Sequence, residues 1–99
     1  MTDAAPRCWW LYLLDCDGRL YTGISTDPAR RLAQHQRGRG ARFTRAARQV
    51  SLHWQCAVGS RSLALQAEYR LRRLPRATKL AVASEVHDRV TLLARLGLD

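Results

Sequence analysis

The chain has 99 residues, of which 46% are hydrophobic and three are proline. This length fits one domain with a single modest core, and this composition excludes a disordered chain. Seventeen lysines and arginines against eight acidic residues give a net charge of +9. A polyanionic partner is therefore expected, and nucleic acid is the commonest one. Sixteen of the seventeen basic residues are arginine, so a GC-rich genome is an alternative source of part of this charge.

The cysteines and the apolar runs indicate the compartment. Cys8, Cys16 and Cys56 form no C-x-x-C pair and lie at no zinc-ligand spacing from a histidine. The apolar run from Cys8 to Leu14 is too short to span a bilayer, and no small-residue cleavage site follows it. We therefore expect a cytoplasmic protein that does not interact with a membrane.

A β-hairpin is expected near the start of the chain. Apolar and aromatic residues lie on both sides of Asp17-Gly18, a dipeptide that supplies the positive φ angles of a tight turn. The expected strands cover residues 9–15 and 19–25.

The first helix is expected over residues 28–37. The carboxylate of Asp27 can accept amide hydrogens of the first turn, and Pro28 fits the first helical position because no hydrogen bond is lost there. Gly38 and Gly40 end the helix. Arg31 and His35 are four residues apart, so they share one helix face.

Arginines without a neutralising carboxylate continue from this helix to residue 48. One interpretation is a surface that follows the phosphates of nucleic acid, with Phe43 available for stacking on a base. The alternative is a solvated basic loop, and for Phe43 we favour a place in the core. The candidate substrate-binding residues are Arg30, Arg37, Arg39, Arg42, Arg45 and Arg48.

A third strand is expected over residues 50–58, where apolar and polar residues alternate. The alternation places Leu52, Trp54 and Cys56 on one face of this strand.

Helices are expected in the remainder of the chain. Ser60 or Ser62 caps the first, which reaches about Leu74. Another runs through Ser84, and residues 90–98 add a short amphipathic segment. The inward face of the first of these helices consists of Leu63, Ala67, Leu71 and Leu74, and it is widened by Ala64 and Leu65.

Glu68 falls inside that apolar face and is the only carboxylate between Asp27 and Glu85. An unpaired buried charge is costly, so a positive partner is expected. One alternative is an ion pair with Arg31 or Arg72. The other is a divalent cation of the magnesium type, which prefers oxygen ligands and keeps several waters, so that one protein carboxylate is enough.

Several of these residues form one ordered pattern: Trp10-Leu11-Tyr12, then Tyr21-Thr22-Gly23, then Arg31 and His35, and finally Glu68. Their order and spacing resemble the core of the GIY-YIG nucleases, over roughly residues 9–85. The likeness is to the small stand-alone bacterial YhbQ-like group.

This resemblance implies an α/β fold. The expected architecture is a single GIY-YIG-type domain, in which helices flank a small three-stranded, mainly antiparallel sheet. The expected organisation is a flexible tail over residues 1–8, the nuclease-like domain over 9–85 and a C-terminal helical extension over 86–99.

The resemblance also assigns roles to five residues. Tyr12 is the favoured general base, with Tyr21 as its hydrogen-bonded partner, although the reverse order stays open. Arg31 would lower the pKa of the phenol and stabilise the transition state, while His35 would orient a tyrosine hydroxyl or transfer its proton. Glu68 would hold the metal ion, with Mg²⁺ favoured and Mn²⁺ as the alternative.

Two hypotheses about function follow. The first is a metal-dependent endonuclease in DNA repair or processing, guided by the shape of its substrate or by a protein partner, with DNA favoured over RNA. The second is a catalytically inactive domain that binds nucleic acid. It is motivated by the absence of any asparagine from the chain, because many GIY-YIG nucleases carry an asparagine after the glutamate.

Overall fold

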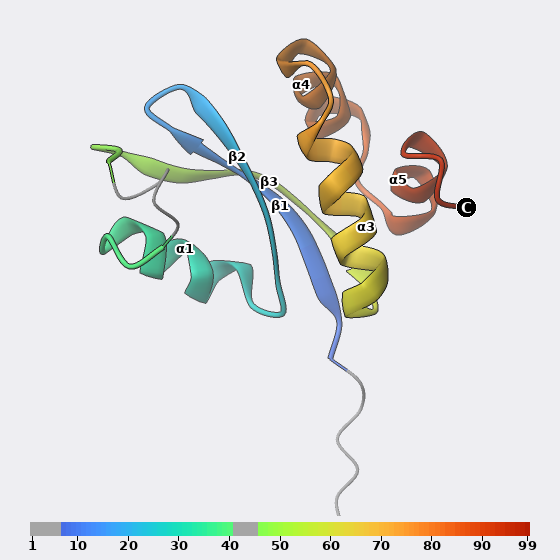
Figure 1. Cartoon of the computed structure of the whole chain (residues 1–99), viewed down its shortest axis with the longest axis horizontal. Coiled ribbons are helices and arrows are strands. Elements are labelled where there is room, and N and C mark those ends of the chain that lie inside the picture. The colour runs from blue at the N-terminus through green and yellow to red at the C-terminus, as the bar shows by residue number, and fades with distance from the viewer. Residues whose placement is uncertain (1–6, 41–45) are drawn as a thin grey trace, which may run out of the picture.

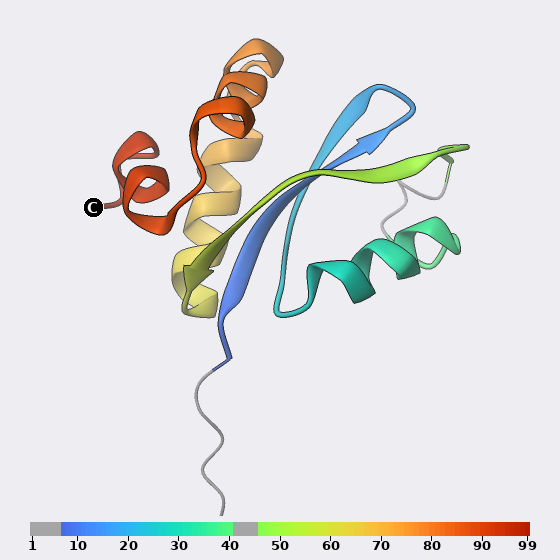
Figure 2. The ribbon, with the colours of Figure 1, turned by 180° about the vertical axis from the view of Figure 1, so that it is seen from behind.

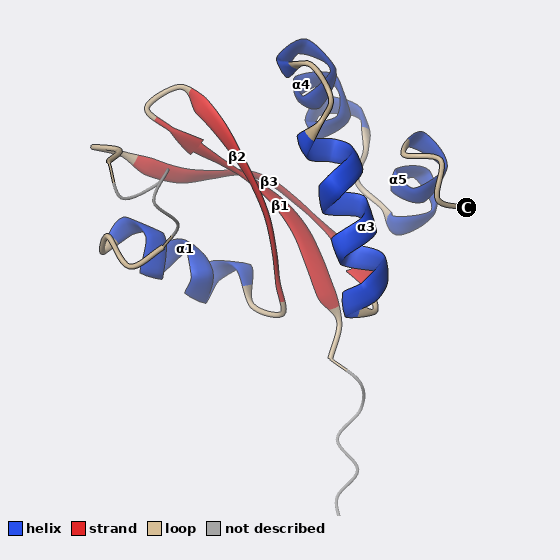
Figure 3. Ribbon diagram, in the orientation of Figure 1, coloured by secondary structure: helices blue, strands red, loops and turns tan. Residues whose placement is uncertain are grey.

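The structure, a computed structural model, describes residues 7–40 and 46–99. Within these residues the chain forms three strands and four helices (Figures 1 and 3). The candidate residues Arg42, Phe43 and Arg45 lie outside the described part. The elements are β1 (Trp9–Cys16), β2 (Arg19–Ser25), α1 (Pro28–Gln36), β3 (Val50–Gly59), α3 (Arg61–Arg72), α4 (Arg76–Glu85) and α5 (Arg89–Arg95).

The turn between β1 and β2 forms at the expected dipeptide. Asp17 and Gly18 have φ angles of 55° and 89°. The Asp17 carboxylate also accepts hydrogen bonds from the backbone amides of Arg48 and Gln49, both at 2.8 Å, which lowers the pKa of Asp17. This side chain therefore connects the hairpin to the chain entering β3.

All three strands are antiparallel, in the order β2-β1-β3. The expected three-stranded α/β architecture is confirmed. In the β1–β2 register Tyr12 pairs with Gly23 and Leu14 pairs with Tyr21. Because directly opposed residues point to the same face of a sheet, both tyrosines lie on one face.

Helices cover both faces of the sheet (Figures 1 and 2). Residues of β1 alternate between the two sides. Leu11 and Leu13 belong to the larger core beneath α3, α4 and α5, whereas Tyr12, Leu14 and Cys16 belong to a smaller cluster against which Leu32 of α1 packs.

A β-bulge in β3 changes which face its residues occupy. Leu13 pairs with Trp54, but Leu14 pairs with Leu52, so His53 is an extra residue in the register. Trp54 and Cys56 therefore lie in the larger core, while Leu52 packs against the smaller cluster. The predicted shared face was right for Trp54 and Cys56 and wrong for Leu52.

Two predicted caps begin helices of the fold. The Asp27 carboxylate accepts from the Arg30 amide, and the Ser60 hydroxyl accepts from the Leu63 amide, each at 3.1 Å. On α3 the fully buried residues are Ala64, Ala67 and Leu71, with Leu63 and Leu74 packed at the margin of the core. Leu65, which was expected to widen this face, is instead exposed.

The chain after residue 85 packs into the main core through α5. Leu92, Leu93 and Leu96 are buried there beside α3 and α4. Across the described residues, the helices are all too short or too polar to cross a bilayer.

Candidate active site

Tyr12 is placed by β1 and is almost completely covered, with 2% of its surface exposed. Its ring lies against the backbone of Gly23 in the neighbouring strand, where a Cβ atom would come within 2.4 Å of the Tyr12 hydroxyl. The glycine of Tyr21-Thr22-Gly23 therefore provides the space that the first tyrosine occupies.

Helix α1 brings His35 to the two tyrosines. The hydroxyl of Tyr12 lies 3.4 Å from Nε2 of His35, and the rings of Tyr21 and His35 meet edge to face with centroids 5.2 Å apart. The imidazole is 1% exposed. Burial and the nearby Arg31 charge both lower the pKa of His35, so this imidazole is neutral at neutral pH.

Arg31 lies on the same face of α1, where it forms a hydrogen bond with Tyr12 and its charge acts on Tyr21. The pKa of Tyr12 is raised to about 12, first by burial and then by the neighbouring Tyr21, while the charge of Arg31 and its hydrogen bond to Tyr12 oppose this rise. Nη1 of Arg31 also donates to Oε1 of Gln34 at 2.8 Å. The guanidinium is thus held beside the phenols by a neighbour in its own helix.

Tyr21 is only half-buried, so it lies nearer to solvent than Tyr12. Burial raises its pKa as well, the charges of Arg31 and Arg72 lower it, and the charge of Glu68 raises it. The solvent-facing side of the cluster therefore consists of Tyr21, Arg31 and Glu68.

Glu68 comes from α3, on the flank of its buried face, and is half-buried. Helix α3 packs against β1 and β2, and the negative charge of Glu68 contributes to raising the pKa of both Tyr12 and Tyr21. Within residues 7–40 and 46–99, the one ion pair found joins Arg95 to Glu85 and does not involve Glu68. The alternative of an ion pair with Arg31 or Arg72 is thus not seen.

The donors around Glu68 suit a hard cation. A carboxylate and two phenol hydroxyls offer oxygen, and oxygen is what Mg²⁺ and Mn²⁺ prefer. The described part of the chain contains no group of three or more His, Cys, Asp or Glu residues able to hold a metal. A magnesium-type ion that keeps most of its water shell fits one carboxylate, whereas a structural zinc site does not.

A basic hollow of about 590 Å³ opens beside the cluster. Arg31 lines this hollow and also acts on the pKa of Tyr12, so this residue belongs to both the hollow and the cluster. Arg48 lies apart from it, at the start of β3. The hollow is lined by Arg30, Arg31, Ala33, Gln34, Arg37 and Arg39, three of which were predicted to bind substrate.

Sequence reasoning missed two supporting residues. Gly40 was expected only to follow the end of the helix, yet a Cβ atom there would lie 1.9 Å from Nδ1 of His35. Gln34 was not singled out, although its spacing of three residues from Arg31 on a helix could have indicated the contact.

Comparisons with known proteins show what this chain is similar to. The family model for the GIY-YIG catalytic domain matches residues 8–81. A UPF0213 protein of Cronobacter sakazakii is 54% identical over 72 residues, covering 72% of this chain and 76% of its own length. A UPF0213 protein of Klebsiella pneumoniae is 44% identical over 99 residues, covering 99% and 93% of the two chains.

A solved structure has a related fold. The solution NMR structure of a UPF0213 protein from Bacillus halodurans is 31% identical to this chain and superposes with a TM-score of 0.52. The match covers 93% of this chain and 99% of that protein.

Proposed function

The chain belongs to the GIY-YIG family, and from this premise we propose that it is an endonuclease that hydrolyses phosphodiester bonds in nucleic acid with the help of a divalent cation. Divalent metals are generally used by GIY-YIG nucleases. The observation that carries the proposal is the meeting of Tyr12, Tyr21, Arg31 and His35 with a half-buried carboxylate, Glu68, that has no ion-pair partner in the described residues.

Hydrolysis needs a water molecule in line with the bond that breaks, a base for that water, and positive charge for the developing phosphorane. Arg31 supplies the charge at the solvent-facing side of the cluster. We assign Tyr12 as the base, because its hydroxyl contacts a neutral imidazole at 3.4 Å. A proton leaving the water can pass to the Tyr12 oxygen as the phenolic proton passes to His35.

This assignment sets a condition on Tyr12. A phenol with a pKa of about 12 is almost fully protonated at neutral pH, so Tyr12 can accept a proton only as it gives its own to His35. A Mg²⁺ ion held by Glu68 would lower the pKa of the attacking water and would polarise the phosphoryl oxygen. Tyr21, whose ring meets the His35 ring edge to face, helps to hold this imidazole beside Tyr12.

The substrate enters over the basic hollow. Arg30, Arg37 and Arg39 are exposed at its rim and can neutralise phosphates on either side of the reacting one. Phosphate contacts carry no base sequence. We therefore propose that substrate structure or a protein partner guides cleavage, with DNA favoured over RNA and repair or processing as the setting.

The test is cleavage of labelled branched and single-stranded oligonucleotides in Mg²⁺ by wild type, Glu68→Gln and Glu68→Ala. Loss of a metal ligand should slow cleavage by at least about a hundredfold while binding changes little, because the metal contributes several kcal/mol to chemistry and less to docking. Ser62→Ala, at an exposed position on the same helix, is the matched control.

Manganese provides a second readout. Electron paramagnetic resonance should detect one Mn²⁺ site in wild type and its loss in Glu68→Gln, with thermal unfolding measured alongside. A wild-type protein that binds nucleic acid in Mg²⁺ and Mn²⁺, cleaves no structure tested and is unaffected by Glu68→Ala would instead be the inactive nucleic-acid-binding domain.

A further inference from the structure

The outer face of α3 has an aromatic residue that the reaction does not use. Tyr69 is 51% exposed, and Leu65, one helical turn before it, is 38% exposed. Helix α3 contacts the core through its buried residues Ala64, Ala67 and Leu71, so the side chains of Leu65 and Tyr69 are not part of the core. A large aromatic side chain left in water beside an exposed leucine points to a contact made with a partner.

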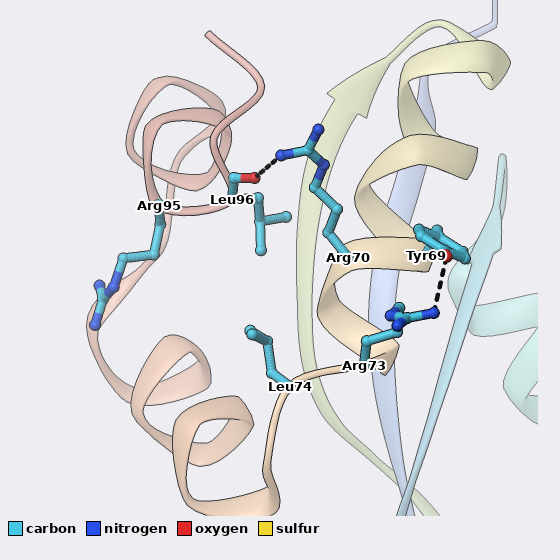
Figure 4. A pocket seen from close by; sticks show the side chains of 6 residues that line it. All are labelled: Tyr69, Arg70, Arg73, Leu74, Arg95 and Leu96. Atoms are coloured by element: carbon cyan, nitrogen blue, oxygen red, sulfur yellow. Dashed lines mark hydrogen bonds between the residues drawn. The ribbon is translucent and has the colours of Figure 1, made fainter.

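Two hollows meet at this side chain. One, of about 420 Å³, lies between α3 and the chain around α5, and the other, of about 340 Å³, is lined by Leu65, Gln66, Tyr69 and Arg70. Figure 4 shows Tyr69 and Arg73 on one side of the larger hollow and Leu74, Arg95 and Leu96 on the other, with Arg70 between them. Tyr69 and Arg70 line both hollows.

The charge of this surface selects an anion. Arg70, Arg73 and Arg95 line the larger hollow, and none of the residues lining either hollow is acidic. Arg70 donates to the carbonyls of Leu96 and Gly97, so its position is fixed by the end of α5. A cationic ligand would be repelled. Arg95 is already paired with Glu85, whereas Arg70 and Arg73 donate to neutral oxygens, so their two charges are the ones that an anion would neutralise.

Arg73 positions the aromatic ring. Its guanidinium lies 5.1 Å from the centroid of Tyr69, and Nη1 donates to the Tyr69 hydroxyl at 2.8 Å. The ring is thus supported by a cation while half of its surface is open. A planar aromatic group held beside guanidinium groups is the arrangement on which an unpaired nucleobase stacks while its phosphate meets positive charge.

The position on α3 favours a strand of nucleic acid over an acidic peptide. In the sequence Tyr69 directly follows Glu68, and Arg73 directly follows Arg72. The charges of Glu68 and Arg72 act on Tyr21 in the candidate active site. A helix is about 10 Å across, so side chains on adjacent rows of its surface can contact nucleotides that are only a few positions apart along a bound strand. A strand whose phosphate reaches Glu68 can therefore place a flanking base at Tyr69.

We propose that Tyr69 and Arg73 form a base-stacking site for an unpaired nucleotide that flanks the reacting phosphate. This inference rests on the proposed nuclease function and deepens it, because it assigns the substrate an unstacked base at a defined place. Tyr69 stacks on the base, Arg73 braces the ring, and Arg70 meets the phosphate.

The test compares two ligands of equal length and charge: a short single strand, and the same strand with every base removed. Affinities are measured in EDTA, so that no cleavage occurs. Wild type should prefer the strand with bases by about tenfold, the effect expected of one stacking contact. Tyr69→Ala should lose this preference, whereas Tyr69→Phe should keep most of it because the ring remains.

Val90→Ala is the matched control, because Val90 is 75% exposed and lines neither hollow. It should behave as wild type. A Tyr69→Ala protein that keeps the full preference overturns this inference, while a wild-type protein that binds no strand overturns the proposed function. Polyglutamate tests for an acidic-peptide site. If wild type binds polyglutamate and Tyr69→Ala loses this binding while its strand binding is unchanged, the surface is a peptide site and the inference is wrong.

Discussion

The ring of Tyr12 packs on Gly23, the residue directly opposite it in the neighbouring strand. A Cβ atom at Gly23 would lie 2.4 Å from Oη and 2.5 Å from Cζ of this tyrosine. Gly23 is not among the glycines with a positive φ angle, so its backbone would accept another residue. Space for the tyrosine ring is therefore the reason for glycine at this position.

Gly23→Ala should destabilise the protein and displace the Tyr12 hydroxyl from His35. The added methyl group cannot be accommodated without moving the ring, and overpacking of this kind typically costs about 1–3 kcal/mol. Urea unfolding would measure the loss of stability. Cleavage should fall further than the fraction of folded protein explains, because the Tyr12–His35 contact is lost.

The double variant Tyr12→Ala/Gly23→Ala is the control. Once the ring is absent, alanine in a strand should be favoured over glycine by about 0.5–1 kcal/mol, so the second substitution should become neutral or stabilising. Additive effects of the two substitutions would show that the steric explanation is wrong.

The local parts of the site were predictable from the sequence. The turn at Asp17-Gly18 and the caps at Asp27 and Ser60 depend on residues a few positions away, and the structure has all three. The pairing of the two tyrosine strands followed from the hairpin, because a tight turn fixes the register.

The contacts between distant segments were not predictable in this way. The bulge at His53 moves Leu52 to the other face, and nothing in the alternating pattern announces an extra residue. Gly40 touching His35 depends on how the chain leaves α1. That the charge of Glu68 would act on the tyrosines was expected only from the family pattern, because it depends on the packing of α3 against the sheet.

Salt should weaken nucleic-acid binding steeply, and arginines of the basic hollow should be responsible. Arg37 and Arg39 are exposed and line this hollow. Each phosphate neutralised adds about 0.9 to the slope of log affinity against log salt for duplex DNA and about 0.7 for single strands. Arg37→Ala/Arg39→Ala should therefore lower the slope by about 1.4–1.8, measured by fluorescence anisotropy across a salt series.

Arg76→Ala/Lys79→Ala removes the same charge from α4, which packs on the opposite face of the sheet from α1. This variant should lower the slope by clearly less than Arg37→Ala/Arg39→Ala does. Equal slopes in the two variants would mean that net charge, and not the hollow beside α1, sets the affinity.

Stability should depend on pH through His35. Its pKa is lowered in the folded protein from an ordinary value of 6.5, first by burial and then by Arg31. The unfolded chain then binds a proton more readily than the folded one, so stability is complete above about pH 6.5 and falls as pH decreases below it. One such group contributes at most about 1.4 kcal/mol per pH unit, which urea unfolding between pH 7.5 and 5 can resolve.

Asp17 and Asp88 do not contribute to the loss of stability between pH 7.5 and 5. Asp17 and Asp88 have pKa values lowered from 3.8, chiefly by backbone hydrogen bonds, so their stabilisation is lost only as pH falls below about 4. His35→Gln should flatten the dependence between pH 7.5 and 5, and His53→Gln, at an exposed position on the bulge, should leave it unchanged. A dependence that persists in His35→Gln would assign it to another group and would remove the reason for treating His35 as neutral beside Tyr12.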